Sequence, residues 1–98
     1  MKEYIIDGAK MTSRAAAHDE LARALSLPAY YGRNLDALWD CVSTMEGKII
    51  LLNADLMEEA LGSYAELLEK VFVEAEDIKF VKKYGEDYDL CRIHFIET

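Results

Sequence analysis

The run KIILL at residues 48–52 is the sequence feature that most restricts the possible fold. Its four apolar residues follow one another without polar positions between them, and Gly47 breaks the chain just before the run. Continuous runs of isoleucine and leucine are typical of a strand at the centre of a sheet that helices cover. The run therefore predicts the central strand of an α/β protein.

The segments before and after this run supply the other elements that we expect. Residues 3–7 end at an Asp7-Gly8 turn signal and are predicted to form a short strand. Apolar residues at helical spacing indicate four helices, and capping residues precede them, such as Thr12 or Ser13 for the first and Asn34 for the second. The predicted helices comprise residues 13–25, 34–44, 56–61 and 63–77. This order of elements indicates a small parallel sheet whose strands are joined by helices.

Residues 78–84 and 90–97 both alternate apolar and polar side chains, and the polar residues 85–89 between them resemble a turn. This pattern predicts a terminal hairpin whose last strand lies antiparallel at the sheet edge. The expected architecture is therefore a parallel sheet of three strands packed by four helices, with an extra antiparallel edge strand. A chain of 98 residues is expected to form a single domain, residues 1–98.

The charge of the chain is unevenly distributed. The net charge is −8, and residues 55–77 contain eight carboxylates against the single cation of Lys70. Such a surface repels nucleic acid and favours a basic protein partner, although a solvated face that only keeps the protein soluble is the alternative. The longest apolar run is too short to span a membrane and no signal peptide is recognisable, so we expect a cytoplasmic protein without membrane contact.

Histidine and cysteine give no sign of a metal site. Cys41 and Cys91 lack metal-type spacing and are expected to be buried free thiols. His18 is expected to be a packed or surface residue, because the only other histidine, His94, is remote in the sequence.

The segment LPAYYGRNLDALWDC, residues 27–41, contains the candidate functional residues. Its first half, with a proline, two tyrosines and a glycine, predicts a loop, and a helix with one apolar stripe follows Asn34. Asp36 and Asp40 lie together beside that stripe, and we call the surface that they form the acidic face. Two carboxylates at this spacing repel each other by roughly 0.2–0.5 kcal/mol on an isolated helix. An aromatic loop that leads into an uncompensated acidic pair predicts a binding surface.

Paired carboxylates also occur as acid–base dyads and as metal ligands. Asp36 and Asp40 lack the partners that such sites need: no glycine-rich phosphate loop precedes a helix, and no nucleophile has a base at motif spacing. We therefore predict that the protein is not an enzyme and uses no metal or cofactor. A generic acidic protein-interaction domain remains an alternative, because aromatic and acidic residues suit any cationic pocket.

Residues 27–41 resemble, nearly residue for residue, the central segment of the barstar family of intracellular ribonuclease inhibitors. Residues 71–75, VFVEA, are similar to part of that family's last helix. The resemblance implies a three-stranded parallel sheet and a protein that blocks the active site of a small basic ribonuclease. Its acidic helix would take the place of the substrate's phosphates, and the inhibitor is expected to be a monomer when free. An immunity protein for another basic nuclease or toxin is the alternative.

The resemblance also implies which residues contact the ribonuclease. Asp40 matches the carboxylate that enters the phosphate pocket, Asp36 matches a second carboxylate contact, and Tyr30 matches an aromatic one. The other matched contact positions are Asn34, Leu35, Trp39, Ser43 and Glu74. For Trp39, which borders the apolar stripe, a place in the core is an equal alternative.

Three positions depart from the family pattern. Arg33 stands where the family has an acidic residue, and Thr44 and Met45 stand where it has glycine and tryptophan. These differences leave the identity of the partner open.

Overall fold

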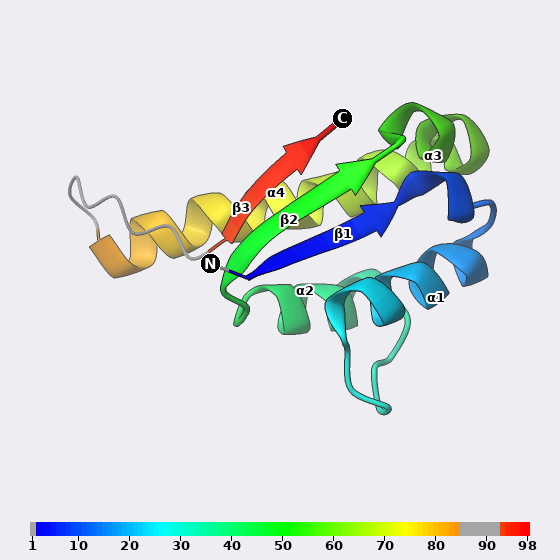
Figure 1. The fold of residues 1–98 in the computed structure, drawn as a ribbon. Helices are drawn as coiled ribbons and strands as arrows, with labels where there is room; N and C mark the ends of the chain where they lie inside the picture. Colours follow the sequence, from blue (N-terminus) through cyan, green and yellow to red (C-terminus); the bar gives the residue numbers. More distant parts are fainter. Residues whose placement is uncertain (1, 85–92) are drawn as a thin grey trace.

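A computed structural model describes residues 2–84 and 93–98, and Figure 1 shows their arrangement. The three strands form one parallel sheet, and the helices connect them in chain order. The elements are β1 (Glu3–Asp7), the 3-10 helix η1 (Gly8–Lys10), α1 (Arg14–Leu25), α2 (Leu35–Val42), β2 (Gly47–Leu52), α3 (Ala54–Leu61), α4 (Ser63–Tyr84) and β3 (Ile93–Glu97).

β2 is the central strand of the sheet, as the KIILL run predicts, and it pairs in parallel with β1 and β3. Ile49 and Leu51 on β2 are buried in the hydrophobic core. The other face of the sheet is only partly covered: Ile5, Ile50 and Ile96 lie side by side across the three strands, and Ile5 and Ile96 are exposed. Helices therefore bury one face of β2 and leave the other half-open.

The C-terminal part of the fold differs from the predicted hairpin. Residues 78–84 belong to α4, and β3 runs parallel to β2, so the predicted strand at 78–84 and the antiparallel edge strand are both wrong. The predicted turn at 85–89 lies outside the described residues. Short alternating runs fit a helix as well as a strand, and Ile78 follows Ala75 at a helical spacing of three residues. The helix consequently continues past the acidic pair at 76–77 that had indicated its end.

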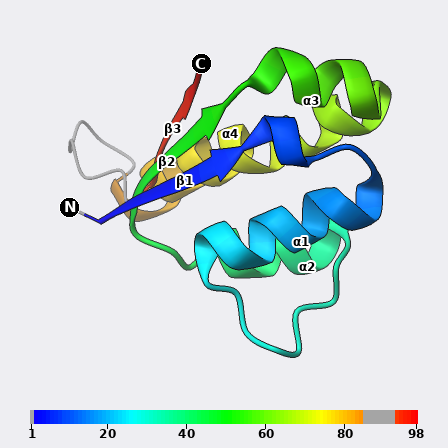
Figure 2. The ribbon, with the colours of Figure 1, turned by 45° about the vertical axis from the view of Figure 1, so that its right-hand side comes forward.

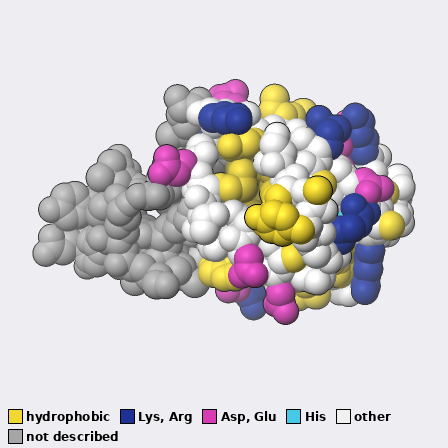
Figure 3. All heavy atoms as spheres, turned by 90° about the horizontal axis from the view of Figure 1, so that it is seen from below, with side chains coloured by type: hydrophobic (Ala, Val, Ile, Leu, Met, Phe, Trp, Pro, Cys, Tyr) yellow, Lys and Arg dark blue, Asp and Glu magenta, His cyan; other side chains and the backbone are white. Residues whose placement is uncertain are grey.

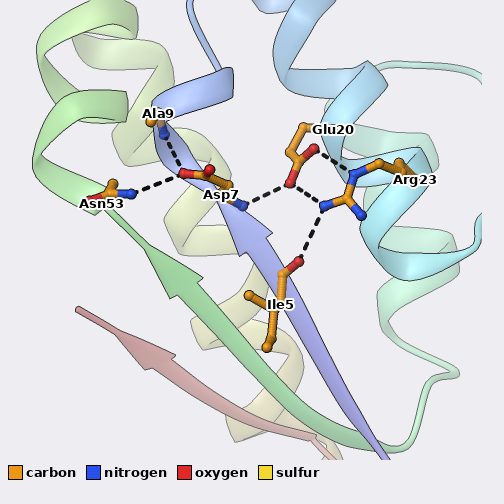
Figure 4. Close-up of polar contacts among 6 residues, drawn as sticks. All are labelled: Ile5, Asp7, Ala9, Glu20, Arg23 and Asn53. Carbon is orange, nitrogen blue, oxygen red and sulfur yellow. Dashed lines mark hydrogen bonds and ion pairs between the residues drawn. The ribbon is translucent and has the colours of Figure 1, made fainter.

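α1 is held to the end of β1 by a polar network of described residues (Figure 4). The buried carboxylate of Glu20 accepts hydrogen bonds from the backbone N–H of Asp7 at 2.8 Å and from Arg23 at 2.5 and 2.8 Å. The carboxylate of Asp7 in turn accepts from the Asn53 side chain at 3.0 Å. The arginine lowers the pKa of Glu20 more than burial raises it, so the ion pair is maintained. The network fixes α1 against β1, and α1 carries His18, which contacts the loop that precedes α2.

Gly8 lies at the close approach between β1 and the end of β2. A Cβ atom at this position would lie 2.4 Å from the backbone oxygen of Asn53, which is closer than two such atoms can stand. The turn after β1 therefore requires glycine for space and not for an unusual backbone angle.

The helices lie on different sides of the molecule. α2 packs against α4, whereas α3 and α2 lie on opposite sides of the molecule in both Figures 1 and 2. Within residues 2–84 and 93–98, the helices include none with the length and apolar character that a membrane span requires.

Candidate functional site

α2 presents an apolar stripe to the core and an acidic face to solvent. Leu38 and Val42 are buried, and Leu35 and Trp39 are half-buried beside them. The predicted stripe is therefore confirmed, and Trp39 lies at its boundary, partly packed against the core and partly accessible. This packing against the core fixes the direction in which the opposite side of α2 points.

Asp36 and Asp40 are both exposed on this helix. Neither carboxylate has a hydrogen bond or an ion pair with any of the residues that the structure describes. Asp36 lies in the first turn of the helix, where the macrodipole favours negative charge, and Asp40 lies one turn later. The acidic face is thus available to an external cationic group.

Both ends of α2 are fixed by side chains. The side-chain oxygen Oδ1 of Asn34 accepts a hydrogen bond from the backbone N–H of Ala37 at 2.7 Å. The side-chain nitrogen Nδ2 of Asn34 donates to the backbone oxygen of Gly32 at 3.2 Å. The predicted cap is therefore confirmed. At the other end, the Ser43 hydroxyl donates to the backbone oxygen of Asp40 at 3.2 Å. Two of the predicted contact residues consequently hold the helix that carries the acidic face.

The two adjacent tyrosines of the preceding loop have opposite environments. Tyr30 is 88% exposed, whereas Tyr31 is buried and its hydroxyl lies 2.6 Å from Nδ1 of His18. The backbone N–H of Tyr31 donates to the Pro28 oxygen at 2.9 Å, which closes a turn. One tyrosine therefore anchors the loop, and its neighbour faces solvent.

Figure 3 shows the side of the molecule that carries α1, α2 and the loop between them. Apolar side chains gather near the centre of this surface, and charged side chains of both signs surround them. An apolar centre with a charged surround is the usual composition of a protein-binding surface.

The last predicted contact, Glu74, lies on α4, the helix against which α2 packs. It is half-buried, and Nζ of Lys70 lies 3.8 Å from its carboxylate. The remaining predicted site residues lie together on the loop and α2, between positions 30 and 43. Glu74 thus comes from a neighbouring element and already has a partner of opposite charge.

The sequence did not reveal that His18 joins three elements. The ring is only 3% exposed, and its Nε2 lies 2.8 Å from the Tyr64 hydroxyl of α4, opposite the contact with Tyr31. The Arg14 guanidinium lies 4.3 Å from the centre of the Tyr64 ring. Burial, followed by the charge of Arg33, lowers the pKa of His18, and burial raises the pKa of Tyr31. These partners are 13 and 46 residues away from His18, so no local pattern indicates them.

A second group that the sequence did not reveal consists of three carboxylates. Glu58 of α3, Glu69 of α4 and Glu97 of β3 have carboxylate oxygens within 4.8 Å of one another. Burial, together with the two neighbouring carboxylates, raises the pKa of Glu69 to about 9. A proton on Glu69 relieves the repulsion at neutral pH. The group involves none of the predicted site residues.

Of the two cysteines, Cys41 has a free thiol that is half-buried rather than fully buried, and Cys91 lies outside the described residues.

Two comparisons with known proteins agree with this geometry. Residues 1–90 match the protein family described as Barstar (barnase inhibitor), a range that includes the loop, α2 and Glu74. The protein named "Putative ribonuclease inhibitor YrdF" from Bacillus subtilis (strain 168) is 40% identical over 80 residues, which cover 79% of this chain and 88% of that protein. Members of this family are inhibitors and not enzymes. The chain therefore belongs to the barstar family of ribonuclease inhibitors.

Proposed function

We propose that this protein inhibits a small basic ribonuclease by placing the acidic face of α2 in the active site of the enzyme. Asp40 enters the phosphate-binding pocket, Asp36 contacts a second cationic group, and Tyr30 covers the edge of the site. The inhibitor acts as a single domain, residues 1–98, and is a monomer before it binds.

The observation that carries the proposal is that Asp36 and Asp40 have no partner within the part of the chain that the structure describes. On α1, Asp19 pairs with Arg33 and Glu20 pairs with Arg23. Asp36 and Asp40, in contrast, are exposed and have no internal partner among the described residues. An unpaired carboxylate keeps all of its acceptor positions for a guanidinium or ammonium group.

An enzyme that binds RNA presents cationic side chains to the phosphates, and a carboxylate of suitable position competes for the same groups. The capped ends of α2 and its packing on α4 hold Asp36 and Asp40 in place before the partner arrives. Little conformational freedom is then lost on binding, so more of the interaction energy contributes to affinity.

The other predicted contacts support this arrangement in different ways. Asn34 and Ser43 position the helix through the backbone bonds described above. Leu35 and the accessible part of Trp39 are apolar and can exclude water around the charged contact. Glu74 is paired with Lys70, so we expect it to contribute more to the rate of association than to affinity.

An inhibition titration tests this function. The purified chain is titrated into barnase and into a panel of other small basic ribonucleases, and cleavage of a fluorogenic RNA is measured. We expect stoichiometric inhibition of at least one enzyme, and loss of inhibition in a variant with Asp36→Asn and Asp40→Asn. The matched control is Asp55→Asn, an exposed carboxylate in the first turn of α3, which should inhibit as the wild type does.

Two results would contradict the proposal in different ways. Full inhibition by the double variant would mean that another surface blocks the enzyme. Absence of inhibition across the panel, together with capture of a basic nuclease that does not cleave RNA, would favour the immunity-protein alternative.

A further inference from the structure

The imidazole of His18 is a buried junction between the loop and the rest of the fold. Its Nδ1 contacts the hydroxyl of Tyr31 in the loop, and its Nε2 contacts the hydroxyl of Tyr64 in the first turn of α4. The ring belongs to α1, which the network around Glu20 fixes to β1. The loop is thus connected through one side chain to two helices of the core, α1 and α4.

Both contacts can be satisfied at once by a neutral ring. A neutral imidazole has one N–H donor and one acceptor nitrogen, and each tyrosine hydroxyl can donate or accept. One tyrosine therefore donates to the ring and the other accepts from it. The distances of 2.6 and 2.8 Å are those of well-formed hydrogen bonds.

The loop has a second attachment two residues further on. The Arg33 guanidinium donates to the Asp19 carboxylate at 2.5 Å and to the Ala15 backbone oxygen at 3.1 Å. This pair is exposed and therefore weak, whereas the contact between Tyr31 and His18 is buried. The buried contact is the stronger restraint on the backbone that carries Tyr30.

We propose that His18 and Tyr31 are positioning residues for the ribonuclease-binding surface. Their hydrogen bond holds the loop so that the neighbouring, exposed Tyr30 is already in position when the enzyme arrives. The inference rests on the proposed function of the loop and α2, and it adds the residues that preorganise this surface. Without the bond the loop would have to be ordered during binding, which lowers affinity.

The chain offers a matched pair of variants that separates positioning from plain stability. Tyr31→Phe and Tyr64→Phe each remove one hydroxyl from the same imidazole and leave the aromatic ring in place. Both should lower the melting temperature, because each leaves a buried nitrogen without its partner. With barnase as the probe, only Tyr31→Phe should weaken binding, by about tenfold. Equal affinity of Tyr31→Phe and wild type, or equal losses in both variants, would overturn the proposal.

A double-mutant cycle with Tyr30→Ala tests whether Tyr31 acts through its neighbour. In the Tyr30→Ala background the Tyr31→Phe change should cost much less affinity than in wild type, because the side chain that it positions is gone. Fully additive losses would overturn the proposal. The variant with Asp36→Asn and Asp40→Asn is measured in the same assay. If this variant loses affinity and Tyr31→Phe does not, only the positioning proposal is contradicted. If this variant keeps full affinity, the proposed function is contradicted.

Hydrogen exchange on the free wild-type protein tests the restraint without any variant. The Tyr31 amide, which donates to the Pro28 oxygen, should be protected well above the level of an unfolded chain. Exchange at the unfolded rate would show that the loop is not held, and would overturn the proposal even if a variant fails to fold or barnase does not bind.

Discussion

The guanidinium of Arg33 is paired with Asp19 of α1 at 2.5 Å, and it also donates to the backbone oxygen of Ala15. Arg33 adopts a left-handed backbone conformation, with φ of 57°, immediately before the Asn34 cap. The charge of Arg33 is therefore partnered within the chain. Arg33 connects the loop to α1 and its charge is largely balanced before any enzyme binds.

The first prediction is that the ion pair between Arg33 and Asp19 contributes little to the free energy of unfolding. Its two side chains are 45% and 69% exposed, so solvent and salt screen the attraction. A double-mutant cycle with Arg33→Ala and Asp19→Ala should give a coupling free energy of about 0.2–1 kcal/mol in thermal or denaturant unfolding. The coupling should decrease in about 1 M salt, where the Debye length is about 3 Å. Zero coupling at low salt would mean that Arg33 is free to face the partner.

The second prediction concerns the pH dependence that Glu69 gives to folding. Its pKa is raised to about 9, from the ordinary 4.5, by burial and by the carboxylates of Glu97 and Glu58. The folded state therefore binds this proton more tightly than the unfolded chain does. Its contribution to stability is fully present below pH 4.5 and is lost as the pH rises toward 9.

Glu69→Gln keeps the shape of the side chain and removes this titration. The melting temperature of the variant should exceed that of wild type by an amount that grows from about pH 5 to about pH 9. The control is Glu66→Gln, which makes the same change at an exposed position in the first turn of the same helix. A difference for Glu69→Gln that does not change with pH would contradict the raised pKa.

The third prediction concerns the rate of association with a basic ribonuclease. The net charge of −8 should steer such an enzyme toward the inhibitor, an effect already known for complexes of this family. In stopped-flow measurements, raising the salt from about 20 mM to about 500 mM should slow association by at least about tenfold and change dissociation much less. An association rate that does not depend on salt would argue against steering.

Much of the fold was predictable because its signals are local. The continuous apolar run marks β2, Ser13 and Asn34 cap the helices that follow them, and the stripe of Leu38 and Val42 is buried as its spacing indicates. Each of these features is determined by residues within one or two turns of the chain. The exposure of Asp36 and Asp40 follows from the same local pattern, whereas nothing local distinguished the exposed Tyr30 from the buried Tyr31.

The features that the sequence did not indicate depend on contacts between distant residues. Whether residues 78–84 form a strand or continue α4 is not decided by a short alternating pattern, which both structures accommodate. The junction at His18 and the pairing of Arg33 with Asp19 likewise connect separate elements, so composition and spacing gave no sign of them. The contacts of His18 and of Arg33 are the ones that attach the loop before α2 to the rest of the fold.

The fourth prediction concerns Asp40, the residue to which the account assigns the centre of the interface. Its removal leaves the enzyme's cationic groups buried without a counter-charge. For desolvated charge pairs, including those in complexes of this family, such a change lowers the binding free energy by roughly 2–5 kcal/mol or more. Asp36→Ala should cost less, because Asp36 lies at the start of the helix and nearer the edge of the surface. Neither variant should lower the free energy of unfolding by more than about 0.5 kcal/mol, since each change relieves a repulsion between carboxylates.

The most direct measurement is the dissociation constant of Asp40→Ala with a ribonuclease that the wild-type protein inhibits, beside Asp55→Ala as the control on α3. We expect Asp40→Ala to weaken binding by at least about thirtyfold and Asp55→Ala to leave it nearly unchanged, with both proteins equally folded. If Asp40→Ala binds the enzyme as tightly as wild type, the acidic face of α2 is not what blocks the active site.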